Sequence, residues 1–349
     1  MIEPPRSICI LRLSAIGDVC HTLPVVRTLQ DHWPETQLTW IIGTLEHQLV
    51  GDIAGIEFLP FDKRAGIAAY RDLRRRLQGR RFDVLLHMQV ALRASMLSTL
   101  VKAGTRIGFD KARAKDWQWL FTNRRIEPQS NAHVMDGLFG FADALGVPHA
   151  PPRWDIPLSA EDHAFALLHI PAEQNALVIS PCSSQRTRNF RNWPVERYVA
   201  VARYAIERHG MRIIVTGGPS RLETEYGAAI AAAVPECVNL SGQTSLKQLQ
   251  ALLARARVLI SPDSGPVHMA NAAGTPVIGL YATSNPERTG PYFNRQYVVN
   301  RYPDAVRKYL GKSVQDASWG QRVRAPDAME LVTVDNVNSR LDALLREIA

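Results

Sequence analysis

The chain has 349 residues, of which 46% are hydrophobic and 21% are charged, and its formal net charge is +8. This length exceeds the usual range of a single hydrophobic core, so we expect two domains. No apolar stretch approaches the roughly 20 residues of a membrane-spanning helix, and the polar N-terminus argues against a signal peptide, so we expect a cytoplasmic protein.

The first half of the sequence alternates strand-like and helix-like segments. Short runs rich in β-branched and other apolar residues predict strands. Segments with apolar residues at helical spacing predict helices, the last of them ended by Gly146. This alternation is typical of a parallel sheet with helices on both faces. The expected strands are residues 8–13, 37–42 and 82–88, and the expected helices are residues 23–30 and 131–145.

A proline-rich segment, residues 147–158 (VPHAPPRWDIPL), lacks periodicity and predicts a linker to a second α/β series. We therefore expect an α/β protein of two Rossmann-like domains, residues 1–155 and 156–349, facing a central cleft. Ligands of such sheets bind beyond the carboxyl ends of the strands. The expected strands of the second domain are residues 176–180, 211–216, 258–260 and 277–281, and its expected helices are residues 195–208, 246–256 and 334–348.

Positive charge is concentrated in one stretch of the first half. Residues 62–125 contain 16 Lys and Arg against 5 Asp and Glu, most densely between residues 71 and 81. Such a stretch can be the solvated surface of a helix, but its length favours an anionic partner: a phosphorylated substrate, a membrane surface or nucleic acid. Nucleic acid is disfavoured because no recognition-helix, zinc-finger or single-strand-binding signature accompanies the charge.

The four cysteines have a spacing that fits neither a zinc site nor a disulfide framework. We expect buried thiols in a reducing compartment. They are Cys9, Cys20, Cys182 and Cys237.

The first predicted strand is followed by residues 13–24 (LSAIGDVCHTLP), which match neither the GxGxxG dinucleotide fingerprint nor a Walker A loop. Instead, Asp18 stands beside a glycine where a helix should start. A carboxylate there can be the helix N-cap. It can equally be a general base that takes the proton of an incoming hydroxyl.

Two loops of the second half suit a nucleotide diphosphate. Residues 180–194 combine serines with Arg186, Arg188 and Arg191, which favours phosphate binding, although a solvated basic loop has the same composition. Glu223 follows a glycine pair and could bind a ribose diol. As an acidic residue in the first turn of a helix, it could instead interact with the helix dipole.

The loop at residues 261–276 (SPDSGPVHMANAAGTP) is the most specific of these signals. Asp263 or Ser264 is expected to cap a helix that begins at Gly265. Unpaired N–H groups at such a helix start bind a diphosphate without a metal ion. His268 lies one turn further on, within reach of a phosphate or sugar.

Taken together, these loops resemble those of the heptosyltransferase family, glycosyltransferase family 9, whose members build the inner core of bacterial lipopolysaccharide. The resemblance covers nearly the whole chain and is strongest in SAIGDVCHTLP and SPDSGPVHMANAAGTPVIGLYATSNPERTGPY. It implies the two-domain GT-B architecture and an ADP-activated L-glycero-D-manno-heptose donor. It also implies inversion at the anomeric carbon, with no cofactor and no metal ion.

The same resemblance implies a role for each matched position. Asp18 is expected to be the catalytic base, with residues 1–155 binding the acceptor and residues 156–349 binding the nucleotide sugar. We also allow for the final helix packing back on the N-terminal domain. The expected donor-binding residues are Ser183, Ser184, Arg191, Glu223, Asp263, Ser264, Gly265 and His268, and the expected acceptor-binding residues are Gly17, His21 and Arg93.

A basic insertion, residues 301–326, is similar to a stretch in the members that add the first heptose to Kdo, so the chain most resembles heptosyltransferase I. We therefore expect transfer to a Kdo-lipid A type acceptor by an enzyme bound peripherally to the cytoplasmic face of the inner membrane, with no nucleic acid partner. The alternatives are a later core heptosyltransferase (II or III), a transferase of another nucleotide sugar, and a non-catalytic nucleotide-sugar-binding protein. The missing glycine fingerprint disfavours a dehydrogenase.

Overall fold

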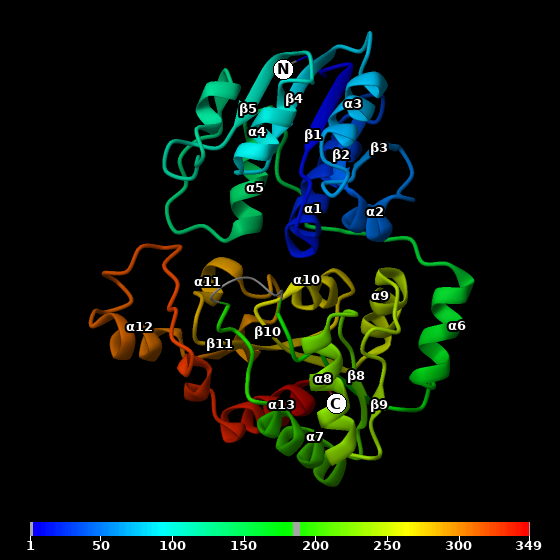
Figure 1. Cartoon of the computed structure of the whole chain (residues 1–349), viewed down its shortest axis with the longest axis vertical. Coiled ribbons are helices and arrows are strands. Elements are labelled where there is room, and N and C mark those ends of the chain that lie inside the picture. The colour runs from blue at the N-terminus through cyan, green and yellow to red at the C-terminus, as the bar shows by residue number, and fades with distance from the viewer. Residues whose placement is uncertain (1–2, 184–188, 349) are drawn as a thin grey trace. The chain divides into compact units, whose positions relative to one another are not determined.

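The computed structural model describes residues 3–183 and 189–348. The chain forms two compact α/β units, Met1–Pro157 and Leu158–Ala349, each built on its own parallel sheet (Figure 1). The sequence analysis placed the division after residue 155, in the same extended segment. The predicted fold class is confirmed. Within the described residues, no helix has the length and apolar character needed to cross a membrane.

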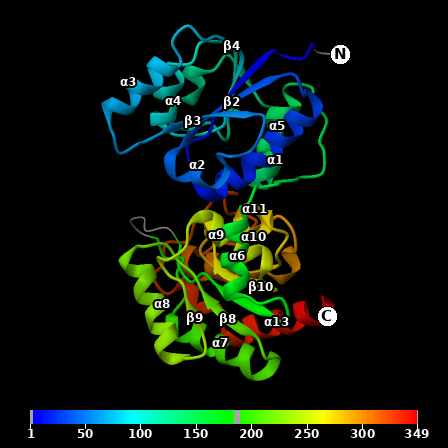
Figure 2. The ribbon, with the colours of Figure 1, turned by 90° about the vertical axis from the view of Figure 1, so that its right-hand side faces the viewer.

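The sheet of the first unit has the strand order β3-β2-β1-β4-β5-β6, and its neighbouring strands pair in parallel. Figure 2 shows α3 and α4 on one face of this sheet and α1 and α5 on the other. Strand order reverses between β1 and β4, and ligands of such folds bind at this reversal. The strands are β1 (Ser7–Leu11), β2 (Gln37–Gly43), β3 (Ile56–Phe61), β4 (Phe82–His87), β5 (Ala103–Gly108) and β6 (Arg124–Arg125).

The first helix begins at Ile16, so Asp18 lies in its first turn, where the sequence analysis expected a helix to start. Helical spacing was noted only from residue 23, although Gly17 and Val19 are already buried in the first turn. The helices of this unit are α1 (Ile16–His32), α2 (Thr44–Val50), α3 (Ile67–Arg76), α4 (Leu92–Ser98), the 3₁₀ helix η1 (Gln118–Phe121) and α5 (Val134–Asp143).

A proline inside α1 is accommodated by the segment that was predicted to be a linker. Pro24 has no N–H, so the carbonyl of Cys20, four residues earlier, lacks its usual helical donor. The indole Nε1 of Trp154 donates to that carbonyl over 2.6 Å. Arg27 in turn donates to the carbonyls of Trp154 (3.2 Å) and Asp155 (2.7 Å). The predicted linker is therefore fixed to α1 along part of its length.

The second unit repeats the arrangement with the strand order β12-β11-β10-β7-β8-β9, again with parallel neighbours. Here the order reverses between β7 and β10. The strands are β7 (Ala176–Ile179), β8 (Arg212–Val215), β9 (Val238–Asn239), β10 (Val258–Pro262), β11 (Val277–Tyr281) and β12 (Val299–Asn300). The helices are α6 (Ala160–His169), α7 (Val195–His209), α8 (Arg221–Ala233), α9 (Leu246–Arg255), α10 (Gly265–Ala272), α11 (Pro286–Thr289), η2 (Arg295–Tyr297), α12 (Tyr302–Leu310), η3 (Ala328–Leu331) and α13 (Val334–Glu347).

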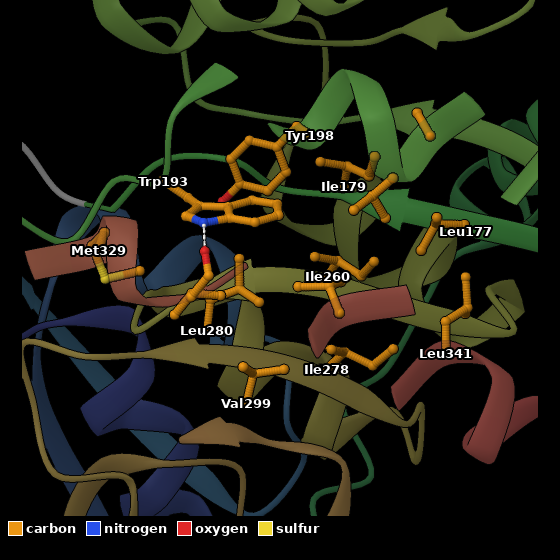
Figure 3. Packing of buried hydrophobic residues seen from close by; sticks show 14 of the residues in the cluster. Leu177, Ile179, Trp193, Tyr198, Ile260, Ile278, Leu280, Val299, Met329 and Leu341 are labelled. Atoms are coloured by element: carbon orange, nitrogen blue, oxygen red, sulfur yellow. Dashed lines mark hydrogen bonds between the residues drawn. The ribbon is translucent and has the colours of Figure 1, made fainter. Parts of the chain in front are cut away.

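The core of the second unit surrounds Trp193, which comes just before α7 (Figure 3). Its ring meets Tyr198 edge-on, with centroids 5.0 Å apart, and its Nε1 donates to the carbonyl of Val332 over 2.9 Å. Ile260 and Ile278 bring the central strands into the same cluster. The buried indole thus links the loop after β7 to the sheet and to the C-terminal part of the chain.

The final helix, α13, belongs to this core. Figures 1 and 2 both show it beside α7, and its buried face presents Val337, Leu341 and Leu344 to the cluster. The sequence analysis allowed this helix to pack back on the N-terminal domain. Its buried face packs within the cluster of the second unit, and a contact with the N-terminal domain stays a prediction.

The cysteines are free thiols, as predicted, with Cys9, Cys20 and Cys182 buried and Cys237 partly buried. Burial raises the pKa of Cys20 and of Cys182 to about 12. These thiols therefore stay protonated near neutral pH and do not act as nucleophiles.

Candidate functional site

The expected catalytic carboxylate lies at the reversal point of the first sheet. Asp18 is in the first turn of α1, and its Oδ1 is 2.6 Å from a guanidinium nitrogen of Arg12. Arg12 is buried where β1 ends and also donates to the carbonyl of Met88, which follows β4. The side chain of Asp18 remains 38% exposed. An oriented carboxylate that solvent can still reach is what a general base requires.

Asp18 also stabilises its own helix, though not as the N-cap. Ala15 occupies the N-cap position, and the N–H of Ala15 donates to Oδ2 of Asp18 over 3.0 Å. This is the side-chain half of a capping box, in which the third helical residue reaches back to the start. The contact with the helix start thus uses Oδ2 of Asp18, whereas the pair with Arg12 uses Oδ1.

Three polar or charged residues near the Asp18 loop were missed by the sequence analysis. Oε1 of Gln89 accepts from the N–H of Leu13 over 2.6 Å, which ties the loop after β4 to the loop before α1. Glu46, in the first turn of α2, is 4% exposed, and burial raises the pKa of its carboxyl group. Arg12 was missed as well. Its signal is a charged residue that ends the apolar run ICIL, directly before the loop that carries Asp18.

The structure places the three predicted acceptor-binding residues differently. Gly17 is buried in the same helical turn as Asp18. Arg93 is exposed in the first turn of α4, which follows β4 at the same edge of the sheet. His21 instead faces inward, is 5% exposed and packs its ring edge-on against His133 at the start of α5. Arg93 and the Asp18 turn thus share one edge, whereas His21 contributes to the contact between α1 and α5.

In the second unit, an ion pair joins the loops after β7 and β10. Arg191 lies 3.1 Å from the Asp263 carboxylate and donates to the Asp263 carbonyl over 2.9 Å. The hydroxyl of Ser284, after β11, donates to the same carboxylate over 2.8 Å, and Nε of Arg191 donates to Asn189. Asp263 is 6% exposed. Because the carboxylate is committed to these partners, it orients the guanidinium and does not cap α10.

The helix α10 begins at Gly265, and Ser264, one of the two predicted caps, occupies its N-cap position. The Ser264 side chain makes no capping hydrogen bond, because its hydroxyl pairs with that of Ser261 over 2.8 Å. The N–H groups of the first turn, beginning at Gly265, therefore receive no acceptor from the cap side chain. Such a turn is suited to bind an anion. His268 follows in the same helix and is 8% exposed.

The loop after β7 is organised by an asparagine that the sequence analysis did not single out. Oδ1 of Asn192 accepts from the N–H and the hydroxyl of Ser183, at 2.9 and 3.1 Å, and Asn189 donates to the same hydroxyl over 2.6 Å. Asn192 could have been suspected from its place before the buried Trp193. The predicted residue Ser184 and the neighbouring Arg186 and Arg188 lie outside the described residues.

Glu223 lies at the carboxyl end of β8, in the first turn of α8. Its carboxylate accepts from the N–H of Gly218 over 2.8 Å and from the hydroxyl of Ser220, the N-cap residue. The contact with the helix start is thus present. Because a carboxylate has about four lone-pair sites, two accepted bonds leave capacity for a ribose diol, and that role stays a prediction.

The two units therefore hold complementary chemistry, each at the carboxyl edge of its own sheet. The first carries an oriented carboxylate beside a guanidinium. The second carries an oriented guanidinium and a helix start, which together suit a diphosphate. Within the described residues, no group of three or more His, Cys, Asp or Glu is placed to hold a metal ion.

Comparison of the sequence with known proteins indicates a single family. A sequence model described as glycosyltransferase family 9 (heptosyltransferase) matches residues 70–312. The lipopolysaccharide core heptosyltransferase OpsX of Haemophilus influenzae is 41% identical over 343 residues, which cover 98% of each chain.

Solved structures show the same fold at lower sequence identity. A glycosyltransferase family 9 protein from Veillonella parvula superposes with a TM-score of 0.81 at 20% identity, covering 98% of each chain. The Escherichia coli heptosyltransferase WaaC, solved with ADP, gives a TM-score of 0.75 at 21% identity, covering 97% of this chain and 99% of that one. The two-sheet architecture described above is therefore that of known GT-B heptosyltransferases.

Proposed function

The chain belongs to glycosyltransferase family 9, and from that membership we propose that it transfers a heptose from ADP-heptose to the Kdo region of the lipopolysaccharide inner core. That it is a glycosyltransferase follows from the family. The observation that carries heptosyl transfer to the lipopolysaccharide core is the 41% identity to OpsX along 98% of both chains.

For the donor, the proposal uses the ion pair and helix start of the second unit. The diphosphate would bind at the first turn of α10, with Arg191 directed at its oxygens by Asp263. Charge develops on these oxygens as the bond to the sugar breaks. Oriented N–H groups and a guanidinium stabilise that charge without rearrangement. Glu223 would bind the ribose, and His268 a phosphate or the sugar.

For the acceptor, the proposal assigns Asp18 as the base. Its carboxylate would take the proton of an acceptor hydroxyl while the oxygen bonds to the anomeric carbon of the heptose. The bond from that carbon to the ADP oxygen breaks on the opposite face, which inverts the configuration and releases ADP. Because the base and the donor residues lie in different units, the reaction requires both units to act on one pair of substrates.

The step in core assembly is proposed from the basic insertion. Residues 301–326 resemble the stretch found in enzymes that add the first heptose to Kdo, and they fold here as α12 and the segment after it. The competing assignment is a later core heptosyltransferase. Acceptors that carry either Kdo alone or Kdo with one heptose would separate the two.

The test is ADP release from ADP-heptose with Kdo-lipid A, in the presence of EDTA, comparing the wild type with Asp18→Asn. The asparagine retains an oxygen for the Ala15 N–H but cannot take a proton. We expect turnover to fall about 100-fold or more, as for the loss of a general base, with ADP affinity unchanged.

A matched control is Asp31→Asn, at the other end of α1, where an exposed carboxylate pairs with Arg153. This variant should keep wild-type turnover. Full activity of Asp18→Asn would exclude Asp18 as the base. The proposed reaction would be excluded if the wild type released no ADP from ADP-heptose, whether the acceptor carried Kdo alone or Kdo with one heptose.

A further inference from the structure

Large apolar side chains are exposed on one part of the first unit. Of the ten large hydrophobic residues that are exposed in the described chain, five fall between residues 92 and 120. They belong to α4 and to η1 with its N-cap residue, Trp117, and these two helices contact one another. We call this set the tryptophan surface. Its members and their exposed fractions are Leu92 (45%), Met96 (54%), Trp117 (66%), Trp119 (51%) and Leu120 (61%).

The turn that carries the tryptophans is anchored from inside. Gln118 is fully buried between Trp117 and Trp119. Its Oε1 accepts from the N–H of Phe109 over 3.1 Å, and its Nε2 donates to the carbonyl of His87 over 2.8 Å. The two indoles are therefore displayed outward by a fixed turn and are not side chains at the end of a loose loop.

The backbone of this turn is in an unfavourable conformation. Asp116 and Trp117 have φ angles of 50° and 56°, in the left-handed region that a bulky residue rarely adopts. Such conformations persist where the surrounding contacts enforce them, and they cluster at functional sites. Here the left-handed residues Asp116 and Trp117 direct the Trp117 ring into solvent. Burial of that ring within the chain therefore does not stabilise the turn.

The charges around the tryptophan surface have one sign. Residues 92–125 contain eight Lys and Arg against two Asp, and one of these, Asp110, is buried in a pair with Arg113. The other cations except Arg106 are exposed and have no ion pair within 4.0 Å among the described residues. They are Arg93, Lys102, Lys111, Lys115, Arg124 and Arg125.

The tryptophan surface lies near the sheet edge where α1 begins and where Asp18 lies. Nε2 of Gln118 also lies 3.3 Å from the carbonyl of Gln89, whose side chain accepts from the N–H of Leu13. Leu13 begins the loop that leads into the Asp18 turn. A partner bound at the tryptophan surface would therefore lie next to the proposed acceptor site.

We propose that the tryptophan surface binds the headgroup region of an anionic lipid bilayer. Tryptophan prefers the boundary between lipid and water, and exposed Leu and Met add apolar area to the contact. Each Lys or Arg near an anionic membrane surface adds to the attraction. A second copy of the chain fits less well, because a self-contact would bring the same unpaired cations together. The link to a lipid-borne acceptor rests on the proposed function, whereas bilayer binding does not.

The direct test is flotation of the full chain with vesicles of phosphatidylethanolamine and phosphatidylglycerol, without donor or acceptor. Vesicles of phosphatidylcholine are the neutral comparison. We expect binding to the anionic vesicles that weakens with added salt. The variant Trp119→Ala/Leu120→Ala should bind about tenfold more weakly for each side chain removed. The matched control, Leu167→Ala/Leu168→Ala, removes two exposed side chains of α6 in the other unit and should bind as the wild type does.

The cationic part of the surface is tested by Lys111→Glu/Lys115→Glu, with Lys111→Arg/Lys115→Arg as the charge-preserving control. Only the glutamate variant should lose binding. The electrostatic part of the proposal would be overturned if the glutamate and arginine variants lost vesicle binding equally. Equal binding of the wild type to neutral and anionic vesicles would overturn it as well.

Tryptophan fluorescence locates the contact. Trp117 and Trp119 are the exposed tryptophans of the described chain. Their emission should shift to shorter wavelength on anionic vesicles as the rings enter the interface. In Trp117→Phe/Trp119→Phe the vesicles should still bind but the shift should vanish. A shift that persists would place the contact elsewhere, and concentration-dependent dimerisation without vesicle binding would assign the surface to a second copy of the chain.

A comparison of acceptors separates this inference from the proposed reaction. Trp119→Ala/Leu120→Ala should retain turnover with a water-soluble Kdo acceptor and lose it, through a higher KM, with Kdo-lipid A in vesicles. Vesicle binding by a protein that transfers no heptose would leave this inference standing and remove the proposed function. Equal turnover of the variant with both acceptors would remove the link between the surface and the acceptor.

Discussion

Arg191 shows how a buried charge can be positioned in advance for a ligand. Its side chain is 12% exposed, and its guanidinium is held by the carboxylate and the carbonyl of Asp263 and by Asn189. A lone guanidinium at this depth would be costly, and the Asp263 carboxylate offsets that cost. The pair thus keeps Arg191 oriented toward the edge of the sheet before any diphosphate arrives.

We expect Arg191→Gln to weaken ADP binding. Losing one charge-assisted contact costs about 1.5–3 kcal/mol, or roughly 10- to 100-fold in affinity. Calorimetric titration with ADP measures this loss of affinity. Arg203→Gln is the control, because Arg203 lies on α7 and donates to the carbonyl of Ala233, away from the β7 and β10 loops. Equal ADP affinity in Arg191→Gln and the wild type would show that Arg191 does not touch the diphosphate.

A second residue-scale consequence concerns His87, which ends β4. Burial is the main cause that lowers its pKa to about 3, and the nearby Arg106 lowers it further. Between the unfolded value near 6.5 and this folded value, the unfolded chain binds a proton that the folded chain does not. Stability therefore falls as the pH decreases through that window, by up to about 1.4 kcal/mol per pH unit.

The replacement His87→Asn removes this titration. Urea denaturation between pH 6 and pH 4.5 gives the free energy of unfolding of both proteins. The pH dependence of this free energy should be less steep in the variant than in the wild type, by up to about 1.4 kcal/mol per pH unit. Parallel pH dependences in the two proteins would show that His87 is protonated equally in the folded and unfolded states.

At the scale of single elements, α1 depends on a contact from outside the helix. The Nε1 of Trp154 replaces the donor that Pro24 removes, and satisfies the carbonyl of Cys20. We expect Trp154→Phe to cost about 1–3 kcal/mol, the penalty for a buried acceptor left unsatisfied. The midpoint of urea denaturation measures the change.

The proline provides the control for this prediction. Pro24→Ala restores an N–H that can donate to Cys20 within the helix, so Trp154→Phe should cost less in that background. A double-mutant cycle with a coupling energy of about 1 kcal/mol would fit the shared carbonyl. Strict additivity would mean that Trp154 stabilises the helix through packing alone.

Elements with a continuous apolar run could be predicted from the sequence, whereas those held by distant contacts could not. Residues 277–281 coincide with β11 because five buried apolar or small residues follow one another. The turn at η1 was missed because its single inward residue, Gln118, is fixed by β4 and by Phe109. In the candidate site, Asp18 was identified from its loop. Its partner Arg12 was not, because their approach depends on how the helix folds back over the strand end.

At the scale of the whole molecule, each unit has its own sheet and its own buried cluster, as the two α/β series in the sequence indicated. The exposed basic and aromatic residues discussed above belong to the first unit, and the diphosphate-binding candidates belong to the second. The proposed chemistry is thus divided between units that could unfold separately. A ligand bound within one unit stabilises mainly that unit, because it acts only on the state that binds it.

This division predicts how ADP should change thermal unfolding. With ADP at about 100 times its dissociation constant, the stability of the second unit should rise by about 2.7 kcal/mol. Differential scanning calorimetry should then show one transition that moves up with ADP and one that stays in place. Trp193→Phe, which removes the indole donor to Val332 in the second core, identifies the second-unit transition by lowering it. If ADP raised the transition that Trp154→Phe lowers, the nucleotide would bind to the first unit, and the assignment of the donor residues would have to be reversed.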